Sequence, residues 1–152
     1  MAANASFQRE AADPYCLAPD DAAMLLRGAP WRRMVVVGDS VAAGISGPVR
    51  GYRDTDGIAR VAEALDVATG SLVYRNLGER DLRTAEIRER QRPAALKLRP
   101  DLVIVAAGGN DVLGRSFDEH QLARELTLLV GPLAARGARV VRSGCSTSPD
   151  PA

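Results

Sequence analysis

Three polar turns in this sequence carry residue types that can perform chemistry together. Ser40 ends the turn GDS, Gly78 ends the turn NLG, and Asn110 lies in the turn GGND. A serine hydroxyl becomes a nucleophile when a base accepts its proton, and the tetrahedral intermediate that follows needs hydrogen-bond donors at its oxyanion. The backbone N–H groups of Ser40 and Gly78 and the side-chain NH2 of Asn110 are such donors. If the fold brings them together, these residues predict acyl transfer through Ser40.

The other residues of these turns are expected to have supporting roles. Gly38 closes the apolar run before Ser40, and a glycine at Gly108 lets main-chain groups approach a substrate closely. Asp39 is expected to organise its turn by hydrogen bonding, and Asp111 is expected to be structural. Ser40 has a simpler alternative as a cap of the turn that follows the strand, and the asparagine of GGND has one as an ordinary turn residue.

Hydrophobic patterning predicts β-strands that alternate with α-helices. Short apolar runs typical of buried strands cover residues 34–37, 72–74, 101–107 and 138–141. Helical spacing covers residues 18–27, 57–69 and 119–136, and a further helix begins at Thr84 and is kinked or split by Pro93. Thr84 and Asp118 are the expected N-caps, whereas residues 1–13 are expected to form a loose arm.

This alternation predicts a doubly wound α/β fold, a mainly parallel sheet with helices on both faces in three layers. In the flavodoxin-like strand order 2-1-3-4-5, the first and third strands are neighbours at the point where such sheets bind ligands. The turns that follow the first three strands then meet at one edge of the sheet. That edge is expected to bring Ser40, Gly78 and Asn110 together.

The three blocks resemble the SGNH, or GDSL, hydrolase family over about residues 30–143. The stretch VVVGDSVAAG is similar to the family's first block, NLG to its second and GGND to its third. The resemblance implies a serine esterase, lipase, thioesterase or deacetylase that acts on a small-molecule acyl ester with neither a metal nor an organic cofactor. It also implies that Ser40 attacks the acyl carbonyl while Gly78 and Asn110 donate to the oxyanion.

The family's last block is a DxxH that supplies the general base and the residue that orients it, and it has no match in this sequence. The single histidine is His120, in the segment DEHQ at the start of the last predicted helix. His120 is a candidate base, with a solvated helix residue as the alternative. We therefore expect an ester hydrolase of impaired activity. An acyltransferase at the same site and a non-catalytic remnant or binding module are the alternatives.

The apolar pattern stops abruptly after Val141, where the chain continues as RSGCSTSPDPA. We expect residues 1–29 to form an N-terminal arm with a short helix, residues 30–143 an incomplete hydrolase domain, and residues 144–152 an aberrant or disordered tail. A shift of reading frame near Val141 is one hypothesis for this change, because the alternative frame allows an apolar continuation. Without a last strand and helix, the exposed edge of the sheet is expected to favour self-association.

Composition argues against several other classes of protein. With 20 Lys and Arg against 19 Asp and Glu, the net charge of +1 predicts no nucleic-acid partner. No apolar run is long enough for a membrane span, and the acidic start lacks the features of a secretory signal, so a cytoplasmic protein is expected. The two cysteines, Cys16 and Cys145, are expected to be reduced, with a single disulfide as the alternative. Because the sequence has only one histidine in addition to these two cysteines, no zinc site with the usual number of ligands is expected.

Overall fold

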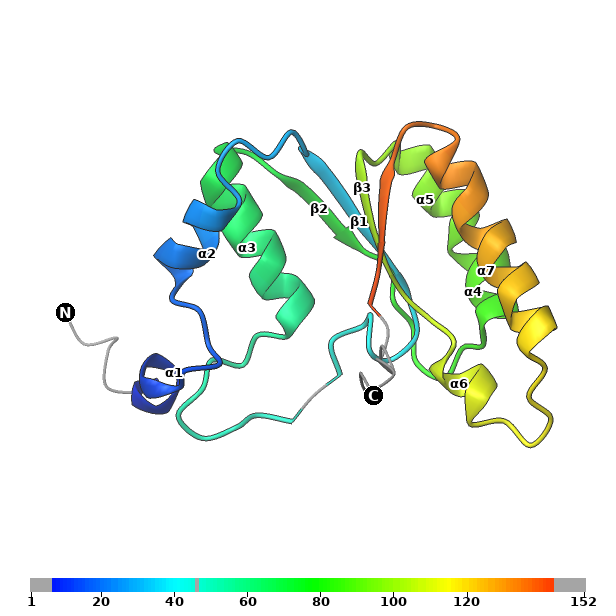
Figure 1. The fold of residues 1–152 in the computed structure, drawn as a ribbon, viewed down its shortest axis with the longest axis horizontal. Coiled ribbons are helices and arrows are strands. Elements are labelled where there is room, and N and C mark those ends of the chain that lie inside the picture. Colours follow the sequence, from blue (N-terminus) through cyan, green and yellow to red (C-terminus); the bar gives the residue numbers. More distant parts are fainter. Residues whose placement is uncertain (1–6, 46, 144–152) are drawn as a thin grey trace, which may run out of the picture.

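A four-stranded parallel sheet lies at the centre of the structure, a computed structural model that describes residues 7–45 and 47–143. The strand order is β2-β1-β3-β4, and every neighbouring pair is parallel (Figure 1). The strands are β1 (Arg33–Gly38), β2 (Val73–Asn76), β3 (Leu102–Ala106) and β4 (Arg139–Arg142). This sheet confirms the doubly wound α/β fold and the first four positions of the predicted strand order.

Helices cover both faces of the sheet, as Figure 1 shows. One layer holds α2 (Pro19–Leu25) and α3 (Gly57–Thr69), and the other holds α4 (Thr84–Arg90), α5 (Arg92–Leu98) and α7 (Glu119–Ala134). Successive residues of β1 point to opposite faces, so Met34 packs with Leu65 of α3 while Val35 packs with Leu129 of α7. The three predicted layers therefore enclose two apolar clusters, one on each side of the sheet.

The inner and outer strands differ sharply in burial. All five residues of β3 are buried, as are the residues of β1 from Met34 to Gly38. The two outer strands, β2 and β4, have no fully buried residue. Continuous apolar strands are typical of the interior of a parallel sheet, where helices cover both faces. The ends of β1 and β3 are therefore the most firmly held part of the sheet.

The helix that was predicted from Thr84 onward is split, as expected near Pro93, into α4 and α5. Pro93 stands in the first turn of α5, where its missing N–H costs no helical hydrogen bond. The prediction that Thr84 is the N-cap is wrong, because Arg83 occupies that position and its N–H donates to the Glu86 carboxylate. Thr84 instead begins the helix and points its hydroxyl into a buried contact described below.

The prediction of a loose N-terminal arm is wrong for residues 7–13. They contain α1 (Gln8–Ala12), and Glu10 pairs with Arg53, which precedes α3, and with Arg60 in the first turn of α3. The Tyr52 hydroxyl donates to Asp13 at 2.7 Å. We call these five residues the N-terminal clasp. Hydrogen bonds from Arg60 and Arg53 lower the pKa of Glu10 to about 2, so the clasp holds a carboxylate at neutral pH.

The structure bears differently on the expectations about membrane spans, cysteines and the domain boundary. No helix among residues 7–45 and 47–143 is long and apolar enough to cross a membrane. Cys16 is half-buried, whereas Cys145, its partner in the disulfide alternative, lies outside the described residues together with the rest of the predicted tail. The domain boundary near residue 29 stays a prediction.

Candidate active site

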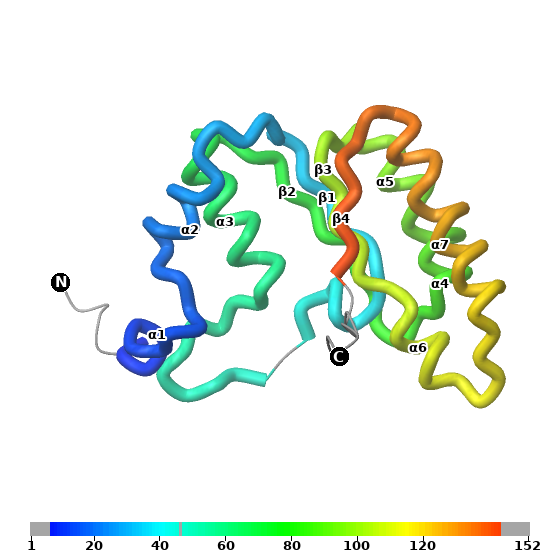
Figure 2. Tube along the Cα trace, in the orientation of Figure 1, coloured from blue at the N-terminus to red at the C-terminus, as the bar shows by residue number. Residues whose placement is uncertain are grey.

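The three polar turns lie at the carboxyl edge of the sheet. Ser40 stands two residues beyond the end of β1, Gly78 two residues beyond β2, and Gly108 two residues beyond β3. Gly38 is paired with Ala106 in the strand register, which aligns the ends of β1 and β3. Figure 2 shows the ends of β1, β3 and β4 at the same edge. The topology thus gathers the predicted turns as the sequence led us to expect.

Asp39 organises the turn that carries Ser40. Its N–H donates to the Ala106 carbonyl at 3.0 Å, and its buried carboxylate accepts the N–H of Val41 at 3.0 Å. Its own carbonyl accepts the N–H of Ala43 at 2.9 Å. These three hydrogen bonds therefore fix the backbone on both sides of the half-buried Ser40. Among the described residues the Ser40 N–H makes no hydrogen bond, which leaves this donor for a ligand.

The Gly78 turn is fastened directly to the Ser40 turn by Asn76. The Asn76 side chain donates through Nδ2 to the Ala42 carbonyl at 2.7 Å and accepts the Gly78 N–H through Oδ1 at 2.8 Å. A Cβ atom at Gly78 would lie 2.5 Å from the Ala43 nitrogen, so only glycine fits there. The N–H that was predicted as an oxyanion donor is thus occupied by Asn76. Sequence reasoning missed this residue, although an asparagine two positions before a glycine is a known turn pattern.

The GGND turn is held by side chains that reach the start of α4. Asn110 lies in the short helix α6 (Gly109–Val112) and donates through Nδ2 to the Leu82 carbonyl at 2.9 Å. An amide NH2 has two donors, so one N–H of Asn110 remains. Asp111 accepts the N–H of Thr84 at 3.0 Å and its hydroxyl at 2.7 Å. Asp111 thus satisfies the N–H and the hydroxyl of Thr84, which is fully buried, and its structural role stays a prediction.

A mainly apolar cavity of about 810 Å³ lies beside the Ser40 turn. Two groups of residues line it, one from the strand ends and one from the helices. The first group is Asp39, Val41, Val105, Ala106, Ala107, Gly108, Gly109, Arg142 and Ser143, and the second is Val112, Leu113, Leu122 and Leu126. The carboxyl edge therefore offers a ligand a largely apolar wall beside the polar turn.

His120 does not line this cavity. The residues of α7 that do so are Leu122 and Leu126, which lie on one face because four positions make about one helical turn. His120 precedes Leu122 by two positions, a rotation of about 200° around the helix axis. It is also exposed to solvent. Its predicted role as base therefore finds no geometric support on this face of the helix.

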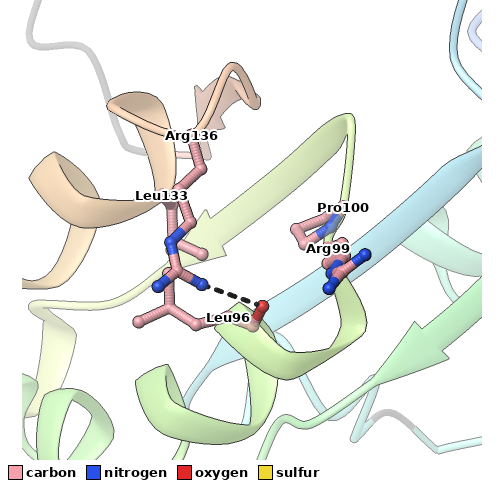
Figure 3. A pocket seen from close by; sticks show the side chains of 5 residues that line it. All are labelled: Leu96, Arg99, Pro100, Leu133 and Arg136. Atoms are coloured by element: carbon pink, nitrogen blue, oxygen red, sulfur yellow. Dashed lines mark hydrogen bonds between the residues drawn. The ribbon is translucent and has the colours of Figure 1, made fainter.

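A second cavity, of about 400 Å³, lies at the opposite edge of the sheet, before β3 begins (Figure 3). It is lined by Leu96, Arg99, Pro100, Leu133 and Arg136, and Arg136 donates to the Leu96 carbonyl at 3.4 Å. It contains neither a nucleophile nor an acid–base pair. The carboxyl edge is therefore the candidate active site.

Comparison with known families assigns the chain. A family model described as GDSL-like lipase/acylhydrolase matches residues 36–152. The chain belongs to this family. The match includes the turns of Ser40, Gly78 and Asn110, and it confirms the resemblance that these turns carried. Comparison with curated protein sequences finds no match.

Solved esterase structures share the fold. The psychrotrophic esterase EstA from Pseudoalteromonas sp. is 21% identical with a TM-score of 0.56, and the match covers 73% of this chain and 58% of EstA. A variant of esterase AlinE4 is 25% identical with a TM-score of 0.59, over 73% and 57%. A variant of Axe2, an acetyl xylan esterase from Geobacillus stearothermophilus, is 18% identical with a TM-score of 0.56, over 76% and 59%. The chain thus spans slightly under three fifths of these proteins.

Proposed function

We propose that this GDSL-family chain is an ester hydrolase domain in which Ser40 forms an acyl-enzyme. The observation that carries the proposal is the attachment of the Ser40 turn to both neighbouring turns. Asp39 bonds to the end of β3 through Ala106, and Asn76 bonds to Ala42 on the other side. A nucleophile needs this kind of fixed geometry, because small displacements of the attacking atom cost large factors in rate.

In the proposed reaction, the Ser40 Oγ attacks the acyl carbonyl carbon while a base accepts the hydroxyl proton. The carbonyl oxygen becomes an oxyanion and accepts hydrogen bonds from the Ser40 N–H and the remaining N–H of Asn110. The Gly78 N–H joins them once it leaves Asn76. Collapse of the intermediate breaks the bond to the alcohol oxygen, which takes up the proton held by the base. Water then gives a proton to the base and attacks the acyl carbon, and the acid leaves as the proton returns to the Ser40 oxygen. The apolar cavity favours an acyl ester with an apolar acyl group.

The base is the weakest part of this site, since the sequence has no DxxH and His120 is exposed on α7. We therefore expect low activity from this chain. The same observation favours one second candidate, a non-catalytic binding module that retains the Ser40 pocket. A cytoplasmic location and the absence of a nucleic-acid partner remain proposals from composition.

The test combines two probes of the 152-residue chain, a fluorophosphonate that labels nucleophilic serines and a short p-nitrophenyl ester. EstA is described in a structure inhibited by monoethylphosphonate, so phosphonates suit a protein of this fold. The variants are Ser40→Ala, His120→Ala, and Ser116→Ala as a matched control at an exposed serine.

We expect a mass adduct on the parent chain that is absent in Ser40→Ala, and slow hydrolysis that falls to the uncatalysed rate in that variant. Ser116→Ala and His120→Ala should stay within about twofold of the parent, because both side chains are exposed to solvent. An adduct that persists in Ser40→Ala refutes the assignment of the nucleophile. A loss above about tenfold in His120→Ala identifies that residue as the base. Neither adduct nor hydrolysis in the parent chain favours the binding module.

A further inference from the structure

Gln91 makes an unusual contact with the strand that leads to Ser40. It lies at the junction of α4 and α5, is 4% exposed, and is separated from Gly38 by 53 positions in the sequence. Its Oε1 accepts the Gly38 N–H at 2.8 Å, and its Nε2 donates to the Gly38 carbonyl at 2.9 Å. One side-chain amide thus pairs with both main-chain groups of a single residue, as a neighbouring strand would.

The contact occurs where β1 loses its neighbour β2. The register of the two strands ends at Val36 and Asn76, and the Leu77 N–H still donates to the Val36 carbonyl. In a parallel sheet, alternate residues direct their N–H and C=O groups to the same neighbour, so Gly38 also faces the β2 side. The chain after Asn76 turns away toward the Ser40 turn. On this side of β1, the Glu79 N–H also donates to the Gly38 carbonyl, at 3.1 Å.

Gly38 needs such an outside partner for two reasons. It is buried, and a buried N–H without an acceptor is costly. Its φ is +150°, and a Cβ atom there would lie 2.0 Å from the Ala106 carbonyl oxygen, so no other residue fits. Glycine has little conformational preference of its own, so its neighbours must fix the backbone at this point. Ser40 follows only two residues later.

We propose that Gln91 is a positioning residue for Ser40. Its amide replaces β2 as the acceptor of the Gly38 N–H, shares the Gly38 carbonyl with the Glu79 N–H, and fixes the direction in which the turn leaves β1. The Gln91 amide acts through Gly38 and Asp39 and does not touch the substrate. It lets the two strands separate at the active edge while the end of β1 stays held. The link to catalysis rests on the proposed role of Ser40, whereas the effect on the turn does not.

The first test needs no substitution. In ¹⁵N-edited NOESY spectra of the 152-residue chain, the hydrogens of the Gln91 side-chain NH2 should show a nuclear Overhauser cross-peak to the Gly38 backbone amide hydrogen. Its hydrogens should exchange at least about tenfold more slowly than those of the exposed Gln121, because hydrogen-bonded buried amides exchange only when the structure opens. Absence of the cross-peak, or exchange as fast as that of Gln121, overturns the proposal.

The second test uses Gln91→Met, which keeps the volume and helical propensity of the side chain but removes both hydrogen bonds. Gln121→Met is the matched control. We expect the Gly38 amide to exchange about tenfold faster in Gln91→Met, with the largest shift changes confined to residues 38–40. The rate constant of fluorophosphonate labelling at Ser40 should fall about tenfold at unchanged affinity for the probe. The control should match the parent in every measurement.

Gln91→Met with parent-like exchange at Gly38 and labelling within twofold overturns the proposal. If this variant does not fold, Gln91→Glu replaces it, because it keeps the acceptor for the Gly38 N–H and loses the donor. Failure of both to fold also overturns a specific positioning role, since Gln91 would then serve folding in general. A parent chain that is never labelled at Ser40 refutes the proposed function alone, and the exchange measurements still decide the effect of Gln91 on the turn.

Discussion

The two sides of the Ser40 turn differ in how they are built. On the side of β2, side-chain amides hold the turn in place. Gln91 forms hydrogen bonds with the backbone of Gly38, and Asn76 donates one to the Ala42 carbonyl. On the side of β4, the turn faces a mainly apolar cavity that Leu122 and Leu126 of α7 line. The groups proposed to orient the nucleophile are thus fixed, whereas the described residues that line the open side include no histidine.

The same contrast separates the inner strands from the outer ones. β1 and β3 are held by partners on both sides, so the residues that follow them emerge in fixed directions. Among residues 7–45 and 47–143, β4 pairs with β3 alone, and Val141 on it is 45% exposed. An edge strand with exposed apolar residues is a known site of association.

The largest effect is expected at the end of β1, on the fixed side. Gly38→Ala places a methyl group against the Ala106 carbonyl oxygen at a positive φ, so we expect a loss of more than about 3 kcal/mol in the free energy of unfolding. Gly57→Ala is the control, because a Cβ atom there meets nothing within 4 Å, and it should stay within about 0.5 kcal/mol of the parent. Urea denaturation measures both. Similar stabilities for the two variants would show that β1 is not tightly held.

A smaller effect is expected from the N-terminal clasp, which anchors the segment after the Ser40 turn. Glu10→Gln should lower the free energy of unfolding at pH 7 by about 1–2 kcal/mol, because Arg53 and Arg60 lose their carboxylate partner. The pKa of Glu10 is lowered from 4.5 to about 2, so its stabilisation is complete above pH 4.5 and is lost as the pH falls toward 2.

The difference between parent and Glu10→Gln should therefore shrink over that pH range in denaturation curves. Glu63→Gln is the control, since Glu63 also pairs with Arg53 but its side chain is 52% exposed, and it should change stability by less than about 0.5 kcal/mol. A difference that is constant from pH 7 to pH 2 would contradict the assignment of the clasp carboxylate.

A substitution on β4 is expected to have the smallest effect on the free energy of unfolding, but a measurable effect on self-association. We propose that the chain self-associates through this edge, and that Val141→Lys weakens the association at least about tenfold by placing a charge on it. Val67→Lys introduces the same charge at a 71% exposed position of α3 and should leave association unchanged. Sedimentation velocity over a range of concentrations compares them. A monomeric parent chain would refute the proposal for the edge.

Much of the fold was predictable because its signals are local. The apolar run before Gly38 indicated β1, Asp118 caps α7 through the N–H of Gln121 as expected, and Pro93 marked the break between α4 and α5. Strand and helix periods are written in neighbouring residues, and parallel topology then fixes which turns meet. For the same reason the turns of Ser40, Gly78 and Asn110 could be placed at one edge.

Local patterns in the sequence were thus enough to predict the family, the order of the strands and the place of the candidate site. The side chains that hold this site became visible only in the folded chain, because their contacts join residues far apart in the sequence. Gln91 to Gly38 spans 53 positions and Arg60 to Glu10 spans 50. No local pattern predicts them, since they depend on where the chain crosses itself. The occupied N–H of Gly78 and the outward face of His120 followed from packing in the same way.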